Sequence, residues 1–160
     1  MLSIQEATPA DVNLLTTLVR EAFREVTERF RLTPANCPKH PSNCVPEWFE
    51  VALAKGVRYY ILAENGTPCG CVALEQAKPE AGYLERLAVL PQCRRKGFGA
   101  ALVAHVCAEA RKLGLRRIEI GIIAAQTELR AWYEKIGFVF TKEAEFPHLP
   151  FKVAFLMKEI

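Results

Sequence analysis

A basic, glycine-containing run joins an apolar segment to a helical pattern: Arg94-Arg95-Lys96-Gly97-Phe98-Gly99. The apolar segment 83–90 ends at Pro91, and apolar side chains recur after the run at helical spacing as far as Gly114. Glycines let a backbone approach an anion because no Cβ blocks the way, and a helix start presents unpaired N–H groups and a positive dipole end. The run therefore predicts an anion site, although a glycine turn with a solvated basic face would explain it equally well.

Strand and helix patterns surround this run. Upstream, the strand patterns 57–63 and 69–77 are joined by Asn65-Gly66, a strong hairpin signal, and with 83–90 they predict three antiparallel strands. Downstream, residues 118–122 alternate as a strand, and apolar residues over 129–136 have helical spacing that ends at Gly137. One further strand is expected to start at 138–140, and the last strand is expected at 152–157.

The first third of the chain adds a strand, two helices and a long loop. Residues 2–7 form a short strand pattern, and Thr8 is a helix cap from which helical spacing runs to about residue 28. Four prolines predict a loop over 31–46, followed by a short helix that Gly56 ends. The resulting order, β-α-α-β-β-β-α-β-α-β-β, predicts one mixed α/β domain over residues 1–160, with parallel strands where helices connect them.

Composition excludes several classes of protein. The chain has 160 residues, is 51% hydrophobic and carries a net charge of +3, which is too mild to indicate a nucleic-acid partner. It lacks a signal-peptide pattern and a long uncharged apolar window, so we expect a cytoplasmic protein without a membrane partner. The six cysteines should then be reduced. Cys37, His40 and Cys44 share one loop but lack the paired spacing of metal sites, so no metal is expected.

Two motifs in this order resemble those of the GNAT superfamily of N-acetyltransferases. The segment from Val89 to Leu102 resembles its acetyl-CoA motif, Gln/Arg-x-x-Gly-x-Gly/Ala, with Arg94, Gly97 and Gly99 in the three defined places. The segment Leu129-Arg130-Ala131-Trp132-Tyr133-Glu134-Lys135-Ile136-Gly137-Phe138 resembles the second signature of the superfamily. The resemblance covers residues 57–140 well and the first helix loosely.

The resemblance implies that acetyl-CoA is the cosubstrate and that its pantetheine arm lies between two splayed parallel strands. In many members an asparagine stands seven residues before the tyrosine of the second motif. Here that position holds Gln126, whose amide is one methylene further out. The implied cofactor-binding residues are Leu87, Ala88, Val89, Arg94, Arg95, Lys96, Gly97, Phe98, Gly99, Ala100, Gln126 and Tyr133.

The resemblance also implies direct attack of an amine on the thioester within a ternary complex. Glu85 is our candidate general base, because strand alternation would put it on one face with Leu87 and Val89; the alternative is an ion pair with Arg86 or another cation. Tyr133 is the candidate general acid for the leaving thiolate, although its spacing equally fits the core. A backbone N–H near Val89 is expected to bind the oxyanion.

The acceptor is expected to meet two proline-stiffened loops, residues 37–44 and 145–151, each of which carries a histidine. His40 and His148 are therefore candidate substrate-binding residues, with plain exposure as the alternative. We expect a small-molecule amine as the acceptor. A protein or peptide amine, a non-catalytic acetyl-CoA sensor, a nucleotide-binding module and a homodimeric assembly stay open.

Overall fold

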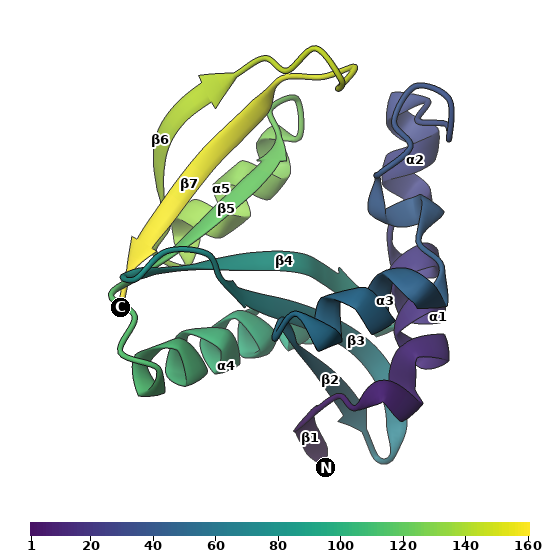
Figure 1. The fold of residues 1–160 in the computed structure, drawn as a ribbon, viewed down its shortest axis with the longest axis vertical. Coiled ribbons are helices and arrows are strands. Elements are labelled where there is room, and N and C mark those ends of the chain that lie inside the picture. The colour runs from purple at the N-terminus through teal and green to yellow at the C-terminus, as the bar shows by residue number, and fades with distance from the viewer.

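The computed structural model describes residues 1–160, in which seven strands form one sheet with helices on both faces (Figure 1). The strands are β1 (Leu2–Glu6), β2 (Arg58–Glu64), β3 (Thr67–Gln76), β4 (Ala81–Val89), β5 (Arg117–Ile123), β6 (Val139–Ala144) and β7 (Val153–Glu159). They lie in the order β1-β2-β3-β4-β5-β7-β6. All neighbours are antiparallel except β4 and β5, so the predicted mixed α/β sheet is confirmed.

Five α-helices accompany the sheet: α1 (Val12–Ala22), α2 (Arg24–Phe30), α3 (Pro46–Ala54), α4 (Phe98–Lys112) and α5 (Thr127–Lys135). The predicted cap at Thr8 is present and opens a 3₁₀ turn before α1. The prediction of a single helix that runs to about residue 28 is wrong in one respect. The backbone leaves helical geometry at Phe23 (φ −93°, ψ 2°), so α1 and α2 are separate helices. None of the helices combines the length and apolar character needed to cross a membrane.

Two adjacent tyrosines on β2 show which helices cover which face. Successive strand residues point to opposite faces of a sheet. The Tyr59 ring packs edge-on against Phe49 of α3 at 5.2 Å, whereas the Tyr60 ring packs against His105 of α4 at 4.6 Å. Helix α3, with α1 beside it, therefore covers one face, and α4 covers the other.

Strands β4 and β5 are paired only at their beginnings. Ala81, Gly82 and Tyr83 pair in parallel with residues of β5, and no pairing continues beyond Tyr83 and Glu119. The teal β4 and the green β5 meet at one end and separate toward the other (Figure 1). The backbone groups along the separated edges are therefore free to meet a ligand, and the predicted splay of two parallel strands is confirmed.

A β-bulge interrupts β4 within the separated region. Its pairing with β3 steps from Glu85 opposite Ala73 to Ala88 opposite Cys71, which leaves one residue more on β4 than on β3. Arg86 takes up the extra residue with a left-handed φ of 50°. A bulge of this kind changes the direction of the side chains that follow it. Strict alternation over Glu85, Leu87 and Val89 was therefore the wrong expectation.

Candidate active site

The start of α4 presents a row of backbone N–H groups. Gly97 is the N-cap residue of α4, with a left-handed φ of 79° that glycine adopts without strain. None of the N–H groups of residues 95–100 donates a hydrogen bond within the protein; the first to do so belongs to Ala101, which donates to the Gly97 carbonyl at 3.0 Å. Unpaired donors at the positive end of a 15-residue helix have the arrangement that the predicted anion site requires.

The three basic side chains before Gly97 have different surroundings. The Arg94 guanidinium donates to the Val89 carbonyl (3.0 Å) and the Ala22 carbonyl (2.9 Å) and pairs with Glu25 (3.0 Å). It therefore ties the end of α1 to the end of β4, and its side-chain donors are largely used within the protein. Arg95, at φ 65°, lines the cavity described next.

Lys96 lies outside that cavity. Its Nζ pairs with Glu64 of β2 at 3.1 Å and lies 5.8 Å from the centre of the Phe98 ring. Its contribution to a bound anion would therefore be long-range charge rather than direct contact.

A cavity of about 520 Å³ opens in front of these N–H groups; we call it the α4 cavity. Gly99 forms part of its wall, where a Cβ would come within 3.2 Å of the Trp132 ring. The remaining cofactor residues suggested by the sequence, with the exceptions of Lys96 and Tyr133, also line it: Leu87, Ala88, Val89, Arg94, Arg95, Gly97, Phe98, Ala100 and Gln126. The free N–H row, the left-handed glycine and the cavity fit a pyrophosphate followed by an extended arm.

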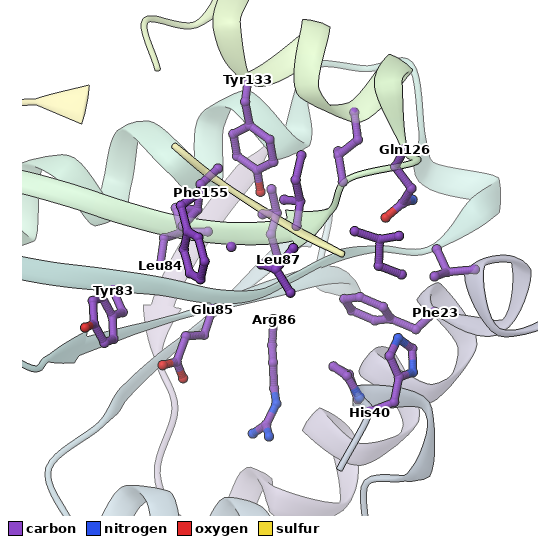
Figure 2. Close-up of a pocket in the computed structure, with 18 of the residues that line it drawn as sticks. Phe23, His40, Tyr83, Leu84, Glu85, Arg86, Leu87, Gln126, Tyr133 and Phe155 are labelled. Carbon is purple, nitrogen blue, oxygen red and sulfur yellow. The ribbon is translucent and has the colours of Figure 1, made fainter. Parts of the chain in front are cut away.

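A second cavity, of about 640 Å³, occupies the gap between β4 and β5; we call it the strand-gap cavity (Figure 2). Its wall includes Glu85, Tyr133 and His40. Five residues line both cavities, namely Phe23, Val26, Leu87, Gln126 and Leu129. Because they share these walls, a molecule in one cavity lies next to a molecule in the other.

Glu85 lies on the α3 side of the sheet. It stands opposite Ala73, which is itself opposite Tyr59, whereas Val89 packs near Gly99 on the α4 side. Burial, together with the nearby Glu75 carboxyl group, raises the pKa of Glu85 to about 8. The alternative ion pair with Arg86 is not formed, since no nitrogen of Arg86 lies within 4 Å of the carboxylate.

Tyr133 projects from α5 toward the strand-gap cavity from the side opposite to Glu85 (Figure 2). Its ring packs edge-on against Trp132 (4.9 Å) and Phe138 (5.2 Å), so it belongs to the core as well. The hydroxyl makes no hydrogen bond within the protein, and burial alone raises the pKa of the phenol above its ordinary value. The group therefore keeps its proton at neutral pH and is free to donate it.

The two candidate histidines differ. His40 is buried and lines the strand-gap cavity, and burial lowers the pKa of its imidazole to about 4. The Ser42 N–H donates to His40 Nδ1 (3.2 Å), which puts the proton of the neutral ring on Nε2. His148 is exposed beside Phe146 and lines neither cavity. Its loop still contributes to the strand-gap cavity, through Phe151.

Sequence reasoning missed two residues that shape the site. Phe23, where α1 gives way to α2, lines both cavities and packs edge-on against His40 at 5.8 Å. Arg86, considered only as a partner for Glu85, lines the strand-gap cavity itself. Nothing local in the sequence signals either role, because the role of Phe23 depends on the helix break and that of Arg86 on the bulge.

Comparison with known proteins agrees with this geometry. The profile of the acetyltransferase (GNAT) family matches residues 14–138, which include all of the residues that line the α4 cavity and all those of the strand-gap cavity except Phe151, Val153 and Phe155. The chain belongs to this family.

Curated relatives are about one third identical to this GNAT chain over the aligned stretches. The amino-acid acetyltransferase of Neisseria meningitidis is 34% identical over 90 residues, 56% of this chain and 20% of that protein. The ribosomal protein bS18-alanine N-acetyltransferase of Escherichia coli is 32% identical over 95 residues, 57% of this chain and 64% of that protein. The matched region is thus less than two thirds of either relative's length.

Solved structures support the same fold. A protein from Desulfovibrio desulfuricans that is assigned to the GNAT family superposes with a TM-score of 0.79 at 20% sequence identity, over 99% of each chain.

Proposed function

We propose that this GNAT chain is an acetyl-CoA-dependent N-acetyltransferase that transfers the acetyl group to a small-molecule amine within a ternary complex. The observation that carries the proposal is the row of free N–H groups at the start of α4. These groups face the α4 cavity, which shares part of its wall with the strand-gap cavity. The α4 cavity suits the pyrophosphate, and the strand-gap cavity, which Tyr133 and Glu85 line, suits the thioester end of the arm together with an acceptor. Shared walls support simultaneous binding and hence direct attack.

Acetyl-CoA supplies an activated acetyl thioester. Glu85 takes a proton from the acceptor amine, which at neutral pH is otherwise almost entirely an ammonium ion. Tyr133 donates its proton to the departing sulfur from the opposite side of the gap. A covalent route through Cys93 in the wall of the α4 cavity is disfavoured, because burial and the neighbouring Cys69 raise the pKa of that thiol to about 11.

A protein or peptide amine is the second candidate acceptor. The E. coli relative is named as an enzyme for a ribosomal protein, whereas the N. meningitidis relative is named as an enzyme for amino acids. A strand-gap cavity of about 640 Å³ with Pro41 and Phe151 in its wall favours a small molecule, since small-molecule sites commonly enclose such volumes.

A two-step experiment tests the proposal. Acetyl-CoA and CoA should raise the melting temperature of the protein, and ATP should not; a preference for ATP would indicate a nucleotide-binding module instead. Incubation with acetyl-CoA and a library of amines should then release free thiol with at least one amine. Binding of acetyl-CoA without release of thiol by any amine, including peptide N-termini, would identify a sensor and contradict the proposed enzyme.

The pH dependence of the reaction should report the ionisation of Glu85. A base acts only when deprotonated, so a raised pKa means that kcat/KM falls as the pH drops below about 8. Glu75→Gln removes the neighbouring negative charge while leaving the Arg86 charge in place. The pH at which kcat/KM begins to fall should therefore be lower in this variant. Glu85→Gln should abolish this fall in kcat/KM and lower kcat by roughly 100-fold or more.

The acceptor amine contributes its own ionisation equally to all three proteins, so their differences isolate the carboxyl group. Superimposable profiles for wild type, Glu75→Gln and Glu85→Gln would rule out Glu85 as the base.

A further inference from the structure

Arg86 occupies a backbone position that ordinarily favours glycine. Its φ of 50° lies in the left-handed region, which costs a residue with a Cβ about 1 kcal/mol. The bulge at this point also breaks strand alternation. Glu85 and Arg86 would otherwise point to opposite faces, but both extend to the same side of the sheet, away from Tyr133 (Figure 2).

The guanidinium of Arg86 is held in place but its charge is not neutralised. Nη1 donates to the Tyr59 hydroxyl at 2.7 Å, and the guanidinium carbon lies 5.7 Å and 5.8 Å from the centres of the Trp48 and Phe49 rings. No carboxylate oxygen lies within 4 Å of it, although the side chain is half-buried.

A half-buried cation without a carboxylate partner is costly. The adjacent Glu85 does little to balance it, because burial and Glu75 raise the pKa of that carboxyl and keep it mostly protonated at neutral pH. Tyr59 uses one of the five guanidinium N–H donors, and the planar fork of the others matches a carboxylate. The wall of the strand-gap cavity thus offers a preoriented cation whose natural counter-ion is absent from the protein.

We propose that the acceptor is an amine that also carries a carboxylate, an amino acid in chemical class, and that Arg86 binds its carboxylate beside Glu85. This rests on the proposed acetyltransferase function and narrows it. Two consecutive side chains on one side of the sheet suit a molecule whose amine and carboxylate are close together. The N-terminal residue of a protein has its carboxyl group in a peptide bond and therefore brings no α-carboxylate next to its amine. This geometry thus disfavours a protein acceptor.

The rest of the same cavity wall is largely apolar. Phe23, Phe151 and Phe155 line it together with Val153 and Ile123. An amino acid bound through Arg86 would place its side chain against these groups, so apolar amino acids should be the better acceptors.

Matched pairs of acceptors test the proposal. We would measure kcat/KM by thiol release at saturating acetyl-CoA for leucine and leucinamide, and for phenylalanine and phenylalaninamide. Wild type should use the amino acids, and Arg86→Gln should lower kcat/KM for them by about 10- to 100-fold, as expected for loss of a charged hydrogen bond, while changing the amides less than about 3-fold. The variant-to-wild-type ratio cancels the different intrinsic reactivity of amide and acid.

Two further variants control the comparison. Arg86→Lys keeps the charge without the fork and should recover part of the loss. Arg24→Gln removes an exposed arginine that lines neither cavity and should behave as wild type. Calorimetry with acetyl-CoA should give wild-type affinity for Arg86→Gln, which shows that the donor half is intact.

The possible failures are distinguishable. If amides and simple amines are acetylated as well as the amino acids, or if Arg86→Gln affects acids and amides equally, the role of Arg86 is wrong and the acetyltransferase function stands. If no amine of any kind releases thiol, both proposals are overturned.

Discussion

Gly97→Asp is expected to weaken acetyl-CoA binding by at least about 100-fold. The substitution puts a carboxylate beside the free N–H groups of residues 95–100, in the place where we expect the pyrophosphate. Two unit charges about 5 Å apart repel by about 3 kcal/mol at an effective dielectric constant of about 20, and about 1.4 kcal/mol is tenfold in affinity. Isothermal titration calorimetry measures the effect directly.

The fold should tolerate this substitution. A Cβ at Gly97 meets no atom within 4 Å, so no clash arises. The left-handed φ of 79° costs a residue with a Cβ about 1 kcal/mol, but a negative charge at a helix start recovers about 0.3–1 kcal/mol. The melting temperature without ligand should therefore change little.

Gly97→Asn is the matched control, because asparagine has nearly the same shape and the same backbone cost but no charge. It should lose only a few-fold in affinity. Normal acetyl-CoA binding by Gly97→Asp would refute the phosphate site, and equal losses for the two variants would mean that bulk rather than charge is responsible.

The parts of this site that the sequence predicts are those that depend on neighbouring residues. The left-handed glycine before α4 and the alternation in β5 follow from local backbone preference and from burial of one face. The expected strands and helices lie close to their observed positions, apart from the break at Phe23.

The parts that it does not predict depend on contacts between distant segments. Arg94 looks like a phosphate ligand in the sequence, yet its guanidinium is engaged by Ala22 and Glu25 of a helix pair about 70 positions earlier. His40 is in a proline-rich loop where exposure is the ordinary expectation, but packing against Phe23 buries it.

The bulge at Arg86 is the clearest case of such a limit. Alternation is a sound rule for a regular strand, and nothing in residues 81–89 signals an extra residue relative to β3. One left-handed residue is enough to put Glu85 on the side of α3 while Val89 remains on the side of α4. The site therefore acquires two charged residues side by side that no sequence pattern would pair.

Tyr133→Phe is expected to lower kcat by about 100-fold or more while acetyl-CoA affinity stays within about 2-fold, the range typical for loss of a general acid. The ring keeps its packing against Trp132 and Phe138, and the hydroxyl has no protein partner that its removal would leave unsatisfied. The melting temperature should therefore be unchanged, which makes the variant a clean probe of proton donation.

Tyr60→Phe provides the matched control for this substitution. Its hydroxyl is also without a partner, but it is fully enclosed beneath α4 and lines neither cavity. Its removal should leave kcat unchanged and stabilise the fold slightly, since a buried hydroxyl without a hydrogen bond is unfavourable. An unchanged kcat in Tyr133→Phe would show that the sulfur takes its proton from another group, and Tyr133 would then be a core residue whose hydroxyl happens to face the cavity.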